Sequence, residues 1–448
     1  MNIALVLLAA GKGTRMNSDL PKVLHQIAGA PMLAHALRTG QVLEPARTVV
    51  VAGHEARMVA AATAEIDEDA TVVLQEEQLG TAHAVDQART ALEGFDGDVV
   101  VLYGDTPFIR DETLERMIAA RCSHDLVILG FEAADPKRYG RLMMDGESLE
   151  RIVEFKDATE EERKVTFCNS GLVACDRATL FALIAAVGND NAAGEFYLTD
   201  IVAIARARGL KVTAVACDES ETLGINSRAE LAQAEAVFQA NARAELLDLG
   251  VTLTAPDTVF LSYDTVIGRD AEIEPNVVFG PGVTVESGAR IRAFSHLEGC
   301  HVSRGAIVGP YARLRPGAEL AENVHVGNFV EIKNATLDEG AKANHLTYIG
   351  DASVGPRTNI GAGTITCNYD GVFKHRTEIG ADVFIGSDTM LVAPVKIGNR
   401  AMTATGAVIT RDVEADALAI ARVKQENKPG RASKLFDMLL ARKAREKQ

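Results

Sequence analysis

The sequence predicts an α/β domain followed by a parallel β-helix. In residues 1–226, short apolar runs rich in β-branched residues alternate with helical stretches. This is the pattern of βαβ units, and it predicts a mostly parallel sheet with helices on both faces. After Val251 an aliphatic residue recurs every six positions, a period that belongs to neither a helix nor a plain strand. A six-residue repeat is typical of a parallel β-helix with three sides in each coil.

Composition and charge restrict the function classes. The chain has 448 residues, 47% of them hydrophobic and 24% charged, as in an ordinary soluble protein of two or three domains. The net charge of -16 argues against a nucleic acid or an anionic membrane surface as partner. No apolar run reaches the roughly eighteen residues of a membrane span, and the first run is too short for a signal peptide. Six scattered cysteines without a CxxC pair predict reduced thiols and a cytoplasmic location.

The first apolar run, Ile3 to Leu8, predicts a buried strand that ends in the turn AAGKGTRM. Glycine lets backbone N–H groups converge on a phosphate without a clashing Cβ. The turn is not a Walker A loop, because Gly13 follows the GK pair, and not a Rossmann fingerprint, because Met16 replaces its third glycine. It therefore predicts a phosphate site of another type, in which Arg15 and Lys22 supply positive charge.

Further strands are expected at residues 48–53, 71–74, 98–105 and 125–132, with a helix around Ala84–Leu92. Ligands of parallel sheets bind beyond the carboxyl ends of the strands. We therefore expect the AAGKGTRM turn and the YGDT turn after the 98–105 strand to face one crevice. The sequence from Ser227 to Glu230 has the form of a capping box and begins a predicted linker helix over residues 227–250.

The β-helix is predicted over residues 251–425, followed by a basic helical tail at 426–448. Its register shifts once and is interrupted once, at 365–380, by an insertion of the kind that reaches for a neighbouring subunit or a ligand. The apolar positions with six-residue spacing are Ile267, Ile273, Phe279, Val285, Ile291 and Leu297, and, after the shift, Val302, Val308, Leu314, Leu320, Val326 and Ile332.

Motifs spread over the whole chain resemble one family. They are LAAGKGTRM, LPK, QEEQLGTAHA, YGDTP, FCNSG, GEFYLTD, GIN, IKN, NHLTYIGD, NIGAGTITCNYDG and IGSD. Together they resemble the bifunctional N-acetylglucosamine-1-phosphate uridyltransferase/glucosamine-1-phosphate N-acetyltransferases. The resemblance implies a Rossmann-like nucleotide-diphospho-sugar transferase domain at 1–226 and a left-handed β-helix acetyltransferase domain at 251–425. It implies acetylation of glucosamine 1-phosphate by acetyl-CoA, then uridylyl transfer from UTP to N-acetylglucosamine 1-phosphate with release of pyrophosphate.

For uridylyl transfer, the resemblance implies that Arg15 and Lys22 are catalytic cations and that Asp105 and Asn226 hold Mg²⁺, for which hard oxygen ligands are suited. Such a transfer needs alignment and neutralised charge more than covalent help. The residues implied to bind UTP or the product sugar nucleotide are Leu8, Ala9, Ala10, Gly11, Lys22, Gln75, Gly80, Thr81, Tyr103, Gly104, Asp105, Gly140, Glu154, Asn169 and Asn226.

For acetyl transfer, a base must accept a proton from the sugar amine near neutral pH, which suits histidine. The resemblance implies His345 as that base, and a bidentate Arg315 among the phosphate-binding cations. Thr405 stands where the family commonly has alanine, which affects one coenzyme A contact. The residues implied to bind glucosamine 1-phosphate are Arg315, Lys333, Tyr348 and Asn359, and those implied to bind acetyl-CoA are Ala362, Asn368, Tyr369, Ser387, Thr405 and Arg422.

The resemblance also implies a homotrimer with sites between adjacent chains, in which the 365–380 insertion lies over a neighbour. Three alternatives are open. The β-helix is only an oligomerisation or regulatory module; it is a γ-type carbonic anhydrase with a three-histidine zinc site; or it is a structural scaffold. The set of His345, Lys333, Arg315 and Asn359 argues against the first, the irregular spacing of the histidines against the second, and the AAGKGTR and YGD turns against the third.

Overall fold

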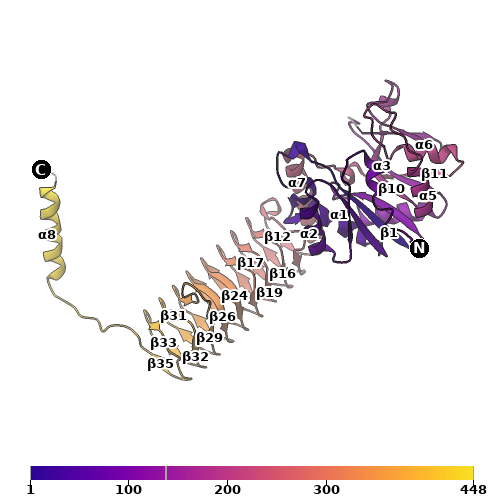
Figure 1. Ribbon diagram of the computed structural model, residues 1–448. Helices are drawn as coiled ribbons and strands as arrows, with labels where there is room; N and C mark the ends of the chain where they lie inside the picture. The colour runs from indigo at the N-terminus through magenta and orange to yellow at the C-terminus, as the bar shows by residue number, and fades with distance from the viewer. Residues whose placement is uncertain (1, 137–138, 447–448) are drawn as a thin grey trace. The chain divides into compact units, whose positions relative to one another are not determined.

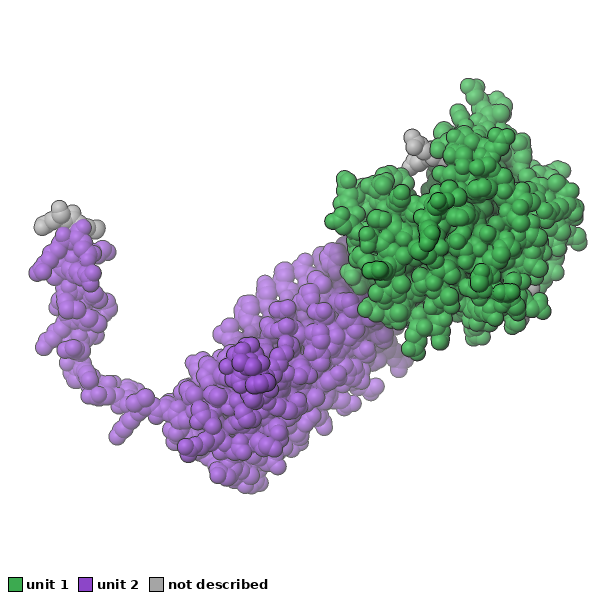
Figure 2. Space-filling view, viewed as in Figure 1, with its two compact units in different colours: residues 1–242 green, residues 243–448 purple. Residues whose placement is uncertain are grey.

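The computed structural model describes residues 2–136 and 139–446. The chain divides into two compact units, Met1–Ala242 and Arg243–Gln448, which Figure 2 colours separately. The first unit is an α/β domain and the second is built on parallel strands stacked in coils, consistent with the predicted left-handed β-helix (Figure 1). The predicted fold class is confirmed.

The first unit is organised on one sheet with the strand order β11-β7-β10-β6-β1-β4-β5. All neighbours in this order are parallel except β10, which runs antiparallel to both β6 and β7. The apolar strand β1 lies in the middle, between β4 and β6. The strands are β1 (Ile3–Ala9), β4 (Arg47–Ala52), β5 (Thr71–Leu74), β6 (Asp98–Tyr103), β7 (Leu126–Glu132), β10 (Phe167–Asp176) and β11 (Val212–Cys217), with β8 (Arg141–Asp145) and β9 (Ser148–Val153) as a hairpin beside β10, and β2 (Gln26–Ile27) and β3 (Ala30–Pro31) as a separate pair.

Helices cover both faces of this sheet, as predicted. Alternate residues of β1 point to opposite faces, so Leu5 and Leu7 pack in one core and Val6 and Leu8 in the other. The first core includes residues of α1 (Met32–Gln41), α2 (Ala56–Ile66) and α4 (Asp111–Arg121), and the second includes residues of α3 (Thr81–Asp86), α5 (Arg177–Ile184) and α6 (Asp200–Ala207).

The helix expected around Ala84–Leu92 is wrong in its bounds, because α3 ends at Asp86 and turns follow. The N–H of Ala88 bonds to Val85 and that of Arg89 to Asp86, three residues back instead of four. Ala88 and Leu92 are nevertheless buried against the sheet, which is why their spacing resembled that of a helix.

The predicted linker helix is α7 (Arg228–Asp248), and the boundary between the units falls within it. Its capping differs from the capping box that was expected. The Ser227 hydroxyl accepts the Glu230 N–H at 3.3 Å, but the Glu230 carboxylate accepts the N–H of Asn226 at 2.7 Å. The helix start therefore fixes Asn226, one of the predicted metal ligands.

The second unit stacks one coil on the next in parallel register. Glu272 pairs with Arg290, Ile307 with His325 and Lys342 with Asn359, steps of 18, 18 and 17 residues. Its strands are β12 (Thr252–Leu253), β13 (Val266–Ile267), β14 (Glu272–Ile273), β15 (Val278–Phe279), β16 (Val283–Val285), β17 (Arg290–Ile291), β18 (His296–Leu297), β19 (Cys300–Val302), β20 (Ile307–Val308), β21 (Arg313–Leu314), β22 (Ala318–Leu320), β23 (His325–Asn328), β24 (Glu331–Leu337), β25 (Lys342–His345), β26 (Tyr348–Val354), β27 (Asn359–Ile360), β28 (Ile365–Cys367), β29 (Thr377–Ile379), β30 (Phe384–Ile385), β31 (Met390–Val392), β32 (Val395–Ile397), β33 (Met402–Thr403), β34 (Val408–Ile409) and β35 (Leu418–Ala419).

The apolar positions predicted from the six-residue period are all buried, from Ile267 to Ile332. The insertion is shorter than the 365–380 expected, because β28 and β29 at its two ends still pair with neighbouring coils. Residues 368–376 form the loop itself. The basic tail contains α8 (Arg431–Arg445), all of whose residues are exposed. None of the described helices is long and apolar enough to cross a membrane.

Candidate active sites

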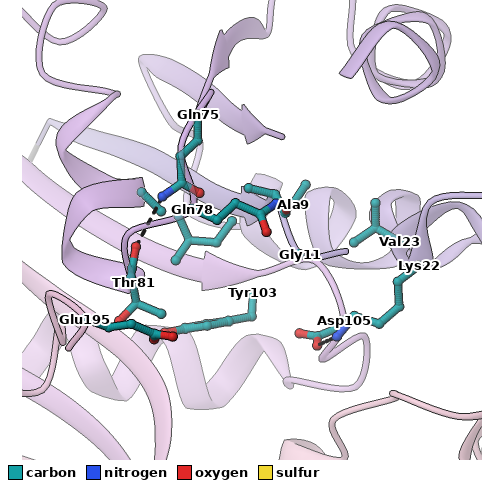
Figure 3. Close-up of a pocket in the computed structure, with 14 residues that line it drawn as sticks. Ala9, Gly11, Lys22, Val23, Gln75, Gln78, Thr81, Tyr103, Asp105 and Glu195 are labelled. Carbon is teal, nitrogen blue, oxygen red and sulfur yellow. Dashed lines mark hydrogen bonds and ion pairs between the residues drawn. The ribbon is translucent and has the colours of Figure 1, made fainter. Parts of the chain in front are cut away.

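A cavity of about 340 Å³ lies at the carboxyl ends of β1, β5 and β6, where the parallel sheet was expected to bind a ligand (Figure 3). The AAGKGTRM turn and the YGDT turn both contribute to it, as predicted. The residues that line it are Leu8, Ala9, Ala10, Gly11, Lys22, Val23, Gln75, Gln78, Gly80, Thr81, Ala84, Tyr103, Asp105 and Glu195. Gly104 lies beside the cavity and donates its N–H to Leu8 at 3.0 Å.

Lys22, in the wall of this cavity, contacts both Asp105, which also lines it, and Asn226, which does not. The Lys22 ammonium forms an ion pair with Asp105 and donates to Asn226 Oδ1 at 3.0 Å. A carboxylate and an amide oxygen from residues 121 positions apart thus converge on one positive charge. Gly13 makes room for the lysine, because a Cβ at Gly13 would lie 2.7 Å from the Cβ of Lys22, and its φ of 58° is left-handed.

Arg15 does not line the cavity. Its side chain is exposed and, among the described residues, forms no hydrogen bond or ion pair. Arg15 belongs to the same glycine-rich turn as Gly11, which lines the cavity, but Arg15 itself is not part of the cavity wall.

Four residues of the cavity were not predicted, Val23, Gln78, Ala84 and Glu195, although the last three lie in motifs that had been noticed. Gln78, in QEEQLGTAHA, donates from its amide to the carbonyl of Ala10, and Glu195 lies in GEFYLTD. The segment with Glu195 reaches the cavity because Phe196 donates its N–H to Leu79 and accepts the N–H of Ala82, and Leu198 donates its N–H to the Thr81 hydroxyl at 2.9 Å. The motifs were the one sign of these residues in the sequence. Only the fold shows that segments about 115 positions apart lie side by side at the cavity.

Gly140, Glu154 and Asn169 lie close to one another, and Glu154 lines a second cavity, which shares Glu195 with the first. Asn169 donates its N–H to Gly140 at 2.8 Å, and a Cβ on Gly140 would lie 3.4 Å from the Glu154 carboxylate. Thr199 donates to Glu154 at 3.2 Å. Burial raises the pKa of Glu154 despite this hydrogen bond.

Tyr103 lines the first cavity, and its phenol is affected by charges at both cavities. Burial, followed by the charges of Asp105 and Glu154, raises the pKa of its phenol, so the hydroxyl stays protonated and available as a donor. Gln75 is buried and its amide donates to the Gly80 carbonyl at 3.2 Å, which orients it at the cavity edge (Figure 3).

In the second unit, His345 lies on an edge where successive coils are joined by backbone hydrogen bonds. Leu346 donates to Asn328 at 3.1 Å, and Gly363 donates to His345 at 3.3 Å. Further along, Asp388 donates to Ala362 and Gly406 to Ser387. Three of the predicted acetyl-CoA residues, Ala362, Ser387 and Thr405, therefore follow His345 along one edge of the β-helix.

The imidazole of His345 is held by Asn328, which precedes it by one coil. Its Nδ1 lies 2.8 Å from Asn328 Oδ1, and the two residues are paired in register between β23 and β25. Because the amide oxygen only accepts, Nδ1 is the donor, and in the neutral ring Nε2 therefore has the lone pair. The free lone pair is what a general base needs.

A group of cations lies on another part of the coils. The neighbouring ammonium of Lys374, then the guanidinium of Arg315, lowers the pKa of Lys333. Arg315 also forms an ion pair with Glu331 at 2.8 Å. Lys374 lies in the insertion and was not predicted as a site residue. The one feature of the sequence that pointed to it was its place in a loop that interrupts the repeats. Three cations so close together favour an anion between them.

Asn368 is buried and donates to Asp351, which also accepts from Asn334 at 2.6 Å. Burial alone would raise the pKa of Asp351, but these two hydrogen bonds, with Lys374 and Lys333 nearby, hold it below its usual range.

The remaining predicted residues are dispersed over one chain. Asn359 pairs with Lys342 and Phe384 in a different sheet from Lys333, and Arg422 is exposed beyond the last strand. Tyr348 pairs with Glu331, next to the cation group, and Tyr369 is exposed on the insertion. A cavity of about 410 Å³ beside His345 is lined by Asn328, Phe329 and His325, among others, but by none of the four predicted sugar residues.

Comparison with known proteins gives matches in both units. Residues 5–197 match the family described as MobA-like NTP transferase domain. Residues 264–299 and 376–411 match the bacterial transferase hexapeptide (six repeats). A solved UDP-glucose pyrophosphorylase, complexed with UDP-glucose, is 16% identical with a TM-score of 0.44, covering 54% of this chain and all of that one.

Curated relatives match over the full length. A protein of Ruegeria sp. (strain TM1040) is 78% identical over 444 residues, 99% of this chain and 99% of the relative. One from Roseobacter denitrificans is 66% identical over 448 residues, all of both chains. One from Jannaschia sp. (strain CCS1) is 64% identical over 439 residues, 98% of this chain and 97% of the relative. Each of the three is named bifunctional protein GlmU.

Proposed function

Because the chain belongs to the family of bifunctional GlmU proteins, we propose where on it each of the family's two reactions takes place. The chain is a uridylyltransferase acting on N-acetylglucosamine 1-phosphate and an acetyltransferase acting on glucosamine 1-phosphate. The observation that carries the assignment of sites is the presence of two separate constellations, Lys22 with Asp105 and Asn226 in one unit and His345 with Asn328 in the other. The two activities are measured separately in one mixture, as thiol released from acetyl-CoA and pyrophosphate released from UTP.

We place uridylyl transfer in the cavity of the first unit. The turn after β1 holds the nucleotide with its backbone, Gln75 faces the base, and Lys22 neutralises charge on the triphosphate. Gly140, Glu154 and Asn169 bind the acceptor sugar in the adjoining cavity and hold its phosphate oxygen toward the α-phosphorus. Arg15 is proposed as a second cation, although it lies outside the cavity wall.

Asp105 and Asn226 fit the Mg²⁺ that the family implies, because their oxygens already converge on the positive charge of Lys22. When bound, the ion neutralises charge on the phosphate oxygens. Asp105 and Asn226 would hold the ion, and Lys22 would be a cation for the triphosphate.

We place acetyl transfer at the edge that carries His345. The Nε2 lone pair, kept free by the Asn328 hydrogen bond, accepts the proton that the sugar amine loses as its nitrogen attacks the thioester carbonyl. The C–S bond of the thioester breaks, and coenzyme A leaves as a thiolate that takes up a proton to give the free thiol. Arg315 and Lys333 bind the sugar phosphate, while Tyr348 and Asn359 orient the sugar. Acetyl-CoA runs along Ala362, Ser387 and Thr405 toward Arg422, with Asn368 and Tyr369 beside it.

The dispersion of these residues over one chain supports a homotrimer whose sites are completed by a second copy. An exposed ladder beside His345 also supports it: Phe294, Tyr311 and Phe329 stack at centroid distances of 4.9 and 5.3 Å, and Leu346 continues the row. On the insertion, Val372 and Phe373 are also exposed. Exposed apolar surface of this kind is typical of an interface.

Phe294→Asp would place an unpaired carboxylate in the interface of the trimer, which makes the free energy of association less favourable by on the order of several kcal/mol per chain. Sedimentation of the unmodified chain is expected to give three times its 47.7 kDa mass. The variant is expected to sediment as a smaller species that has lost acetyl transfer but retains uridylyl transfer. A monomer with full acetyl transfer would rule out the trimeric site.

Glu154→Gln is expected to stabilise the fold at neutral pH and to weaken binding of N-acetylglucosamine 1-phosphate. The folded-state pKa of Glu154 is raised above the usual 4.5, so its charged form opposes folding at neutral pH. The variant should therefore unfold at higher denaturant concentration at pH 7, and this gain should shrink as the pH falls through the raised pKa and vanish below about 4.5. The KM for N-acetylglucosamine 1-phosphate should rise about tenfold, because a charged hydrogen-bond acceptor is lost. A variant that is less stable than the unmodified chain by the same amount at pH 7 and below about pH 4.5 would contradict this.

The location proposed for the enzyme is the cytoplasm. All six cysteines are free thiols, and three of them are buried, which supports a reducing compartment.

A further inference from the structure

The turn at residues 11–19, between β1 and Lys22, has little support of its own. Only Met16 is buried in it. Its backbone hydrogen bonds are internal, from Met16 to Gly13 at 2.9 Å and from Asn17 to Thr14 at 3.4 Å. Gly13 and Asn17, at its two bends, have φ values of 58° and 49°. Something outside the turn must therefore fix the position of this segment.

Arg228, the first residue of α7, supplies that contact. Its guanidinium donates to the Met16 carbonyl at 3.2 Å and to Nδ1 of His25 at 3.2 Å. Among the residues that the structure describes, the bond to Met16 is the one hydrogen bond joining residues 11–19 to an element outside residues 11–25. Met16 and His25 lie on either side of Lys22 in the sequence, so one side chain holds both ends of the segment that carries it.

His25 is a fixed point for this contact. It is buried, and its carbonyl accepts the N–H of Met32 at the start of α1. Because arginine only donates, Nδ1 of His25 is the acceptor and the ring is neutral. Burial, then the charge of Arg228, lowers the pKa of His25, in keeping with a neutral ring.

The same turn of α7 also organises the other side of the cation site. Asn226, two residues before Arg228, accepts from the Lys22 ammonium at 3.0 Å, and Glu230 fixes the Asn226 N–H at 2.7 Å. Two residues at the start of α7 thus help to place Lys22 against Asp105. The amide of Asn226 contacts the Lys22 ammonium, and the guanidinium of Arg228 contacts Met16 and His25, on either side of Lys22 in the sequence. Arg228 itself does not line the cavity.

We infer that Arg228 is a positioning residue for uridylyl transfer, which holds the segment from the glycine-rich turn to His25 so that Lys22 meets the reacting phosphates. This inference rests on the proposed role of Lys22. A misplacement of about 1 Å at a reacting centre costs on the order of 100-fold in rate.

Arg228→Gln is therefore expected to lower kcat for pyrophosphate release by roughly 10- to 100-fold. The KM for N-acetylglucosamine 1-phosphate should not change, because Gly140, Glu154 and Asn169 are untouched, and thiol release by the other unit should be unaffected. The matched control is Arg208→Gln, an exposed arginine that also donates to a backbone carbonyl, that of Ala182 at 3.3 Å, but away from the cavity. A KM that rises with an unchanged kcat would overturn the inference.

His25 gives a second pair of variants. His25→Asn keeps an acceptor near the place of Nδ1 and should retain more activity than His25→Leu, which has no acceptor. Equal kcat in the two folded variants would count against the contact with Arg228.

A double-mutant cycle separates the inference from the role of Lys22. If Arg228 acts through Lys22, Arg228→Gln should have much less effect in a Lys22→Met background than alone. The same loss in both backgrounds would overturn the inference and leave the proposed site standing. Full activity of Lys22→Met alone would instead remove the proposed site, and the inference with it.

Discussion

His345→Ala is expected to lower the rate of thiol release from acetyl-CoA by about 10²- to 10⁴-fold, the range of a lost general base. Asn328, the residue that orients the imidazole, has no basic atom and could not take the place of His345 as proton acceptor. Pyrophosphate release from UTP, supplied with N-acetylglucosamine 1-phosphate, should be unchanged. Both rates are followed with the same purified chain.

The matched control is His296→Ala, another exposed histidine of the β-helix, which should leave both rates unchanged. Because His345 is exposed, its removal should leave the unfolding transition where it was. If thiol release survives in His345→Ala, the base has been misassigned. If both activities fall in a folded protein, the separation into two sites is wrong.

Lys22→Met is expected to have the converse effect. It keeps the length of the side chain but removes the charge that meets Asp105 and Asn226, and pyrophosphate release should fall by about 10²- to 10³-fold, as for other lost charge-stabilising donors. Thiol release should be unchanged.

The control for this variant is Lys211→Met, an exposed lysine that precedes β11 at the amino end of the strand. The cavity lies at the opposite ends of the parallel strands, so this variant should be fully active. A Lys22→Met enzyme as active as the control would contradict the proposed role of the cavity.

The opening motif shows how far sequence reasoning reached in the first unit. The apolar run of β1 and its glycine-rich end correctly predicted where a cavity lies, because parallel strands bring their carboxyl ends to one edge. That this cavity binds a phosphate stays a prediction. The motif did not predict that Arg15 would lie outside the cavity wall, because the direction of an exposed side chain on a turn depends on backbone angles such as those at Gly13 and Asn17. The sequence also predicted too long a helix after Ala84, because buried residues in turns repeat every three or four positions as they do in a helix.

In the second unit, the six-residue period determined the β-helix, since each buried aliphatic residue marks one side of a coil. The length of the insertion was less accessible, because strands of two or three residues, such as β28 and β29, leave little pattern.

By itself, the sequence determined the class of both folds and the residue types that their chemistry needs, because buried periodicity and strand ends are local properties of a chain. Only the tertiary structure decided which of these residues meet: Lys22 with Asp105 and Asn226, Arg228 with Met16, His345 with Asn328. Such contacts depend on segments up to 212 positions apart, and their distances follow from packing and register, which no local pattern encodes.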